Sequence, residues 1–127
     1  MPECLEIDLS DVEEGQEIAL IASQNDQFRL ERGSQRSIAG QWVLTAGVHG
    51  RGPVFIKAAV EAVAAFDCFT EDNDPHGERE FGAFQIEGVK LFWKIDLYDR
   101  AFETGSPMRS DLYQTARVLT IMFPNEY

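Results

Sequence analysis

Acidic side chains concentrate in the segment 71–80, where they offer oxygen ligands for a hard cation. Three residues match ligand positions one, three and five of a calcium-binding loop: Asp72, Asp74 and His76. The twelfth position is Ala83, where such a loop requires a bidentate glutamate, so the match fails. The segment is also typical of a turn, in which Asn and Asp side chains accept bonds from nearby N–H groups. We expect no resident metal ion, with a hard-cation site that adds Glu78 or Glu80 as the alternative.

A second group of polar residues lies on one side of the strand predicted at 89–97. Alternation along a strand places Lys94 and Asp96 on the same face, about 7 Å apart at the usual rise per residue. Tyr98 follows on that face, and Arg117 is expected across the strand pair. Half-covered, this face would form a ligand pocket with shifted pKa values; fully exposed, it is an ordinary solvated face. The hypothesis of a catalytic or ligand site uses these residues: Asp74, Glu78, Lys94, Asp96 and Asp99.

Other catalytic motifs are missing from the chain. The two histidines, His49 and His76, cannot form a three-histidine zinc site and lie in no H-x-x-x-H pattern. No G-x-S-x-G, G-x-G-x-x-G or Walker A sequence is present, which argues against the common hydrolase, dinucleotide and P-loop sites. Cys68 ends a predicted apolar helix and is expected to be buried and unreactive. No cofactor is expected.

The pattern of apolar residues predicts two helices and four strands. Helical spacing predicts a first helix over 12–31, and Pro53 is suited to begin a second, mostly apolar helix. The strands are predicted at 41–45, 84–86, 89–97 and 116–123. Glu87-Gly88 joins two of them as a hairpin turn, and Asn25 on the apolar stripe is expected to be a buried amide bound to backbone. The predicted fold is α+β: an antiparallel sheet of about four strands with two helices packed on one face, in the order α-β-α-β-β-β.

The charge of the chain is strongly negative and unevenly distributed. A formal net charge of -11 arises from 22 acidic and 11 basic residues. Residues 1–20 contain seven acids and no base, and residues 61–80 contain seven acids and one arginine. Such a field repels nucleic-acid phosphates and attracts a basic surface, although a solubilising role explains the same charge. Nine acids are candidates for partner binding: Glu6, Asp8, Asp11, Glu13, Glu14, Glu17, Glu71, Asp72 and Asp74.

Length and composition predict a single globular domain over residues 1–127, because 44% hydrophobic residues suffice for one core. No apolar run is long enough for a membrane span. The start of the chain, Met1–Glu6, lacks the basic and apolar regions of a secretory signal. Two cysteines without ligand spacing are typical of a reducing compartment, so the expected location is the cytoplasm.

A set of short motifs occurs in a fixed order over most of the chain: Asn25-Asp26, Phe28-Arg29, Phe66-Asp67, Asn73-Asp74-Pro75, Gly77-Glu78, Phe81-Gly82, Trp93-Lys94-Ile95-Asp96, Tyr98-Asp99, Gly105-Ser106-Pro107, Arg117–Met122 and Glu126-Tyr127. With these motifs the chain resembles a family of small bacterial proteins known only as a domain of unknown function, found mainly in alphaproteobacteria and often on plasmids. The resemblance covers roughly residues 18–127 and leaves the acidic start outside. His76, Arg79 and Glu80 depart from the family's usual Tyr, His and Asp.

The resemblance implies a plasmid or phage setting but no reaction. Together with the two acidic blocks and the missing catalytic motifs, it favours a non-enzymatic module that binds a basic protein surface. A concrete version is a mobile-element inhibitor that occupies the nucleic-acid-binding surface of a host defence complex. The alternative is a small enzyme or ligand-binding domain with a polar cleft, in one version around a divalent cation.

Overall fold

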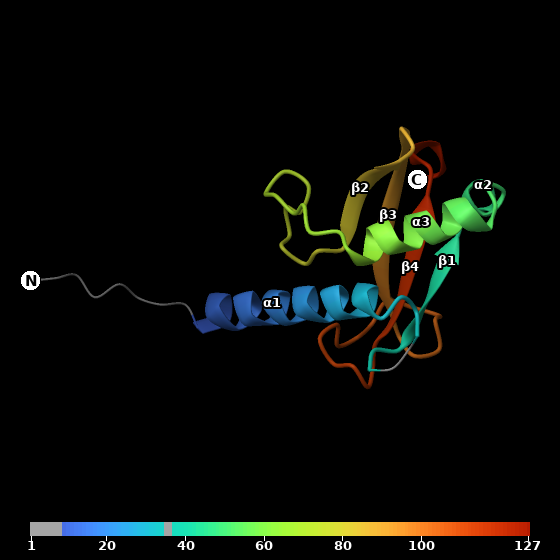
Figure 1. Ribbon diagram of the computed structural model, residues 1–127. Coiled ribbons are helices and arrows are strands. Elements are labelled where there is room, and N and C mark those ends of the chain that lie inside the picture. The colour runs from blue at the N-terminus through green and yellow to red at the C-terminus, as the bar shows by residue number, and fades with distance from the viewer. Residues whose placement is uncertain (1–8, 35–36) are drawn as a thin grey trace, which may run out of the picture.

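The computed structural model describes residues 9–34 and 37–127, with side chains from residue 13 onward (Figure 1). Its helices are α1 (Leu9–Leu30), α2 (Ala46–His49), α3 (Pro53–Ala64) and a closing 3-10 helix, η1 (Pro124–Glu126). Its strands are β1 (Gly40–Leu44), β2 (Phe81–Ile86), β3 (Val89–Tyr98) and β4 (Ala116–Met122). The two predicted helices and four predicted strands are confirmed, and the sequence did not predict the short helices α2 and η1.

The four strands form one sheet in the order β1-β4-β3-β2, which confirms the α+β class. The expectation of an antiparallel sheet holds for two of the three strand pairs, because β1 lies parallel to β4. β4 pairs antiparallel with β3 on one side. On its other side it pairs with β1, which runs in the same direction as β4. The sheet is therefore mixed. Between β1 and its neighbour β4 the chain forms α2, α3 and the β2–β3 hairpin.

The hairpin of β2 and β3 forms because its two turn residues adopt left-handed backbone conformations. Glu87 has φ 52° and Gly88 has φ 80°, the pattern of a two-residue turn whose twist matches the flanking strands. The pairing runs from Ile86 opposite Val89 to Phe81 opposite Lys94, so β2 begins three residues earlier than predicted. The hairpin thereby extends the sheet to the loop that precedes β2.

The core lies between one face of the sheet and the helices α1 and α3, which cover that face (Figure 1). Alternation along β3 buries Leu91, Trp93 and Ile95 here and leaves Lys94 and Asp96 on the opposite face, as predicted. Trp93 is fully buried and contacts Phe66 edge-on, with ring centroids 5.5 Å apart. Neither α1 nor α3 covers the opposite face (Figure 1), and Lys94 and Asp96 there are about 40% exposed.

One prediction about the second helix is wrong. Pro53 does begin α3, but the helix ends at Ala64, before it reaches Cys68. Cys68 lies in the following loop and is exposed, whereas burial had been predicted. Phe66, which belonged to the predicted helical pattern, instead packs on Trp93 from an irregular segment, together with Phe69.

Among the described residues, no helix is both long and apolar enough to cross a membrane.

Candidate functional site

Two acidic segments that are far apart in the sequence lie side by side. The loop 65–80 projects on the same side of the molecule as the N-terminal half of α1 (Figure 1). Asn25 of α1 donates a 2.9 Å hydrogen bond to the backbone oxygen of Glu78, and Gly77 lies against Ile18. Between helix and loop is a hollow of about 530 Å³, here called the acidic hollow. Its lining includes Glu14, Glu17, Pro75, His76, Glu78 and Arg109.

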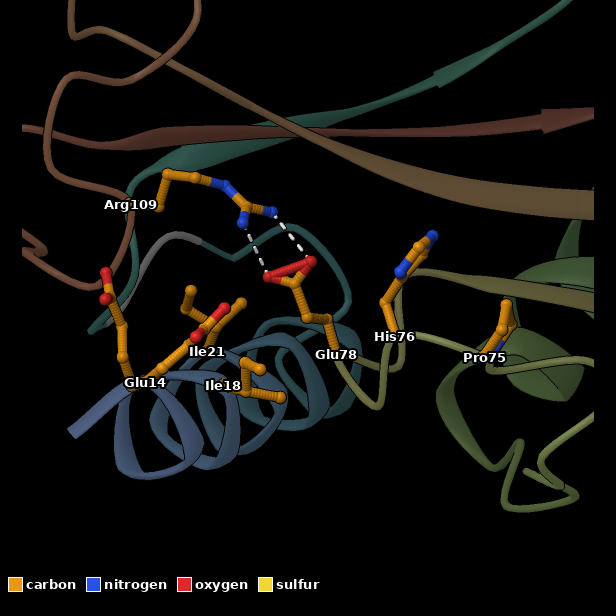
Figure 2. Close-up of a pocket in the computed structure, with 8 residues that line it drawn as sticks. Glu14, Ile18, Ile21, Pro75, His76, Glu78 and Arg109 are labelled. Carbon is orange, nitrogen blue, oxygen red and sulfur yellow. Dashed lines mark hydrogen bonds and ion pairs between the residues drawn. The ribbon is translucent and has the colours of Figure 1, made fainter. Parts of the chain in front are cut away.

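An ion pair between a buried carboxylate and a half-exposed arginine forms one wall of the acidic hollow. The Glu78 side chain is 8% exposed. Arg109 Nη2 donates a 2.9 Å hydrogen bond to its Oε1, and Arg109 Nη1 forms an ion pair with its Oε2 at 2.7 Å (Figure 2). Such a two-pronged pair is geometrically rigid. The Glu78 carboxylate raises the pKa of Arg109, so this arginine stays charged. A ligand therefore meets a fixed ion pair. The exposed Glu14 and Glu17 of α1 supply negative charge and form no ion pair with a cation of the described residues.

A second hollow of about 470 Å³, here called the sheet cleft, lies where the loop 65–80 meets β3 and the C-terminal residues. It shares His76 and Arg109 with the acidic hollow, so the two are neighbours. Its other polar lining residues are Asn73, Glu80, Lys94, Asp96 and Tyr127. The predicted neighbours Lys94 and Asp96 form an ion pair, with 3.1 Å between Nζ and Oδ2. Both side chains are about 40% exposed, so this pair contributes under ~1 kcal/mol to stability.

Glu80 is the carboxyl group with the largest perturbation in the sheet cleft. Its pKa is raised to about 7, first by burial and then by the hydrogen bond and negative charge of Glu78, with Asp74 adding repulsion. The positive charge of Arg109 lowers the pKa of Glu80, but Arg109 is itself ion-paired with Glu78. No cation of the described residues forms an ion pair with Glu80. A carboxyl that titrates near neutral pH in a cleft suits either proton transfer or binding of a cation.

The residues of the catalytic hypothesis do not meet in one place. Lys94 and Asp96 line the sheet cleft, and Glu78 is held by Arg109 in the acidic hollow. Asp74 accepts a 3.0 Å bond from the backbone N–H of Arg79, and so closes a turn. Asp99 closes another turn by accepting bonds from Glu103 N and Thr104 Oγ1. The described residues include no cluster of three His, Cys, Asp or Glu side chains fit to hold a metal ion.

The expected place of Arg117 beside Lys94 and Asp96 is wrong. Arg117 pairs with Leu97, on the helix-covered face, and its side chain is fully buried. Its Nε donates to Asn25 Oδ1 at 2.7 Å, and its Nη2 donates to Gln24 Oε1 at 3.0 Å. Burial lowers the pKa of Arg117 to about 10. Asn25 itself is fully buried and bound to backbone, which confirms the prediction for that amide.

The predicted partner-binding acids fall into three groups. Glu13, Glu14 and Glu17 are exposed on α1, and the loop carries three more: Glu71 and Asp72, which are exposed, and Asp74, which is half-buried. Asp11 lies in α1, and its side chain is outside the described part. Glu6 and Asp8 lie outside the described residues altogether.

Sequence reasoning missed two residues of these hollows. Arg109 lies in the long loop between β3 and β4, where nothing periodic marks it, and its partner Glu78 is 31 positions away. Tyr127 follows η1 and lines the sheet cleft, and its only signal was its place among the family motifs. Neither contact can be inferred from spacing, because both depend on how the two loops close over the sheet.

Comparison with known proteins identifies a family but no activity. The sequence model of a family described as "protein of unknown function (DUF3768)" matches residues 44–126, which include every element from α2 to η1. The chain belongs to this family. The match is shorter than the resemblance expected over roughly 18–127, and α1 lies outside it. No curated protein and no solved structure matches the chain.

Proposed function

We propose that this member of the DUF3768 family is a binding protein whose acidic hollow engages a basic protein surface. The observation that carries the proposal is the meeting of two acidic segments: Glu14 and Glu17 of α1 line the same hollow as His76 and Glu78 of the loop 65–80. These segments are separated by about half of the chain, and their carboxylates add their fields only because the fold joins them. A basic surface is the complementary partner of such a region.

The geometry of the hollow favours recognition over catalysis. Glu78, its most buried carboxylate, is already bound by Arg109, so it does not offer a free acid or base. Glu13, Glu14 and Glu17 are exposed along α1 and are available to a large partner. Exposed carboxylates of this kind accelerate association through long-range attraction, and salt weakens that attraction.

A specific form of the proposal is an inhibitor carried by a mobile element. Its acidic surface would occupy the part of a bacterial defence complex that otherwise holds nucleic acid. The exposed carboxylates of the hollow and the plasmid setting implied by the sequence resemblance support this form. The competing function, a small enzyme, draws support from Glu80, which was not one of its predicted residues, because the five predicted residues are dispersed or paired.

Charge reversal tests the proposal with a matched control. The test variant is Glu14→Lys with Glu17→Lys, and the control is Glu87→Lys with Glu103→Lys, which makes the same change in net charge at exposed sites elsewhere. Each tagged protein is incubated with a bacterial lysate, and the bound proteins are identified at about 50 mM and about 500 mM salt.

The expected result is a bound protein with a basic surface that the parent and the control retain at low salt and lose at high salt. The test variant should bind it at least about tenfold more weakly, since each removed charge contact is replaced by a repulsion. Equal binding by test and control variants would contradict the proposal. So would a partner whose binding is insensitive to salt.

A further inference from the structure

The sheet cleft contains an aromatic surface beside its charged groups. Phe81, Phe92 and Tyr127 pack against one another, with ring centroids 5.0 to 6.0 Å apart. Tyr127 stands nearly perpendicular to both phenylalanine rings and is 77% exposed. The cluster already holds one cation, because Lys90 Nζ lies 5.5 Å from the centroid of Phe92. Aromatic faces attract cations through their ring quadrupoles, so an exposed ring at this place favours a cationic guest.

The charged groups of the cleft leave one carboxyl without a counter-ion. Lys94 is paired with Asp96 at 3.1 Å, and Arg109 is paired with Glu78 at 2.7 Å. Glu80 lines the same cleft and forms no ion pair with any cation of the described residues. The backbone oxygen of Glu80 accepts a 2.7 Å bond from Ile95 N, which fixes its main chain beside β3. The Glu80 side chain shares a hydrogen bond with Glu78 but has no cation partner among the described residues. The cleft therefore combines a carboxyl without a counter-ion with an accessible aromatic ring.

We propose that the sheet cleft is a socket for an arginine side chain of the basic partner. A guanidinium donates two parallel hydrogen bonds to a carboxylate and also stacks on an aromatic ring, and the socket offers Glu80 for the first and Tyr127 for the second. A lysine ammonium has no flat face to stack, so it fits only the carboxyl. An anion would meet the carboxyls of Glu80 and Asp96. The inference deepens the proposed function and rests on it for the identity of the partner.

Binding in the socket depends on pH in a defined direction. The charged or titratable groups that face Glu80 are Glu78, Asp74 and Arg109, and the cleft also holds His76, Lys94, Asp96 and Tyr127. The pKa of Glu80 is about 7, so the carboxyl is mostly protonated at pH 6 and mostly ionised at pH 8. A guanidinium needs the ionised form, so the affinity should be about tenfold higher at pH 8 than at pH 6.

The test is a titration of the whole protein, followed by the NMR signals of its backbone amides. The probe is Nα-acetyl-arginine methylamide, and the control probe is the citrulline compound, which has the same shape and no charge. We expect saturable shifts at Glu80, Phe81 and Lys94 with the arginine probe and none with the citrulline probe. Glu80→Gln should weaken binding at least about tenfold, and Tyr127→Ala severalfold. Glu87→Gln, at the exposed hairpin tip, should leave it unchanged.

Equal shifts with both probes, no saturable shift, or full binding by Glu80→Gln would each overturn the socket. The outcome is separable from that of the proposed function. If the arginine probe binds but no basic partner is captured, the socket is supported and the proposed function is contradicted. If a basic partner binds Glu80→Gln as tightly as the parent, the proposed function is supported and the socket is contradicted.

Discussion

Replacing Asn25 by alanine should destabilise the protein strongly, although the residue touches neither hollow directly. Asn25 is fully buried and makes two hydrogen bonds: it donates to the backbone oxygen of Glu78 at 2.9 Å and accepts from Arg117 Nε at 2.7 Å. Arg117 is also fully buried and has no carboxylate partner among the described residues. The Asn25 amide oxygen thus accepts a hydrogen bond from the buried guanidinium of Arg117. Its amide nitrogen anchors the loop 65–80 to α1 through the backbone oxygen of Glu78.

The size of the effect follows from the two groups that lose a partner. A buried polar group left unsatisfied costs about 1–3 kcal/mol, and more where it carries charge. For the Glu78 oxygen and the guanidinium N–H together, the expected loss is about 3–5 kcal/mol of the free energy of unfolding. That is a large share of the roughly 5–15 kcal/mol by which domains are stable, and it corresponds to a Tm lower by on the order of 10 °C.

Urea denaturation measures this loss, and a second background isolates its cause. In Arg117→Met the cation is absent, so Asn25→Ala should cost at least about 1 kcal/mol less there than in the parent. Asn125→Ala, at an exposed position in η1, is the matched control and should change stability by less than about 0.5 kcal/mol. A loss below about 1 kcal/mol for Asn25→Ala, or the same loss in both backgrounds, would refute the reasoning.

Two further predictions concern stability. The pKa of Glu80 is raised above its ordinary value to about 7, so the native state holds this proton more tightly than the unfolded chain and loses stability as pH rises from about 4.5 to about 7. Glu80→Gln should therefore be more stable than the parent at pH 8, by on the order of 1 kcal/mol after solvent screening of a half-exposed group. The difference should vanish near pH 4. Thermal melts across this pH range measure the difference, and one that widens toward low pH would contradict the prediction. Gly82→Ala should destabilise by about 1–3 kcal/mol, because a Cβ there would lie 2.3 Å from Trp93 Nε1 and 2.8 Å from the Phe66 ring. Gly105→Ala, with nothing within 4 Å of its Cβ position, is the control in the same denaturation assay, and equal effects at both sites would argue against close packing over Gly82.

The hairpin shows where local sequence was sufficient for prediction. Glu87 and Gly88 between two alternating runs predict a two-residue turn, and the turn alone sets the register of β2 against β3. Alternation along β3 places Lys94 and Asp96 on one face, so their ion pair was predictable too. Such features depend on neighbours within about ten residues. Side chains alternate between the two faces of a strand, and this alternation determines which of these neighbours can be in contact.

For Arg117, alternation along the strand indicates burial, whereas its hydrogen-bond partners come from far away in the sequence. Alternation along β4 puts Arg117 on the face of Leu119 and Ile121, which favours its burial over a place beside Lys94. The amides that make this burial tolerable come from Gln24 and Asn25, 93 and 92 positions away. The polar position Asn25 on an apolar helix stripe was visible in the sequence, but its partner was not.

Composition and alternation were enough to determine the element types, the α+β class and an excess of carboxylates, because these depend on each residue and its near neighbours. The parallel β1–β4 pair, the exposure of Cys68 and the joining of the two acidic segments came from the folded arrangement. So did the perturbed pKa of Glu80, which depends on burial and on Glu78 and Asp74 held close to it. Charge is a property of the residues, whereas a binding surface requires that distant residues share one place in space.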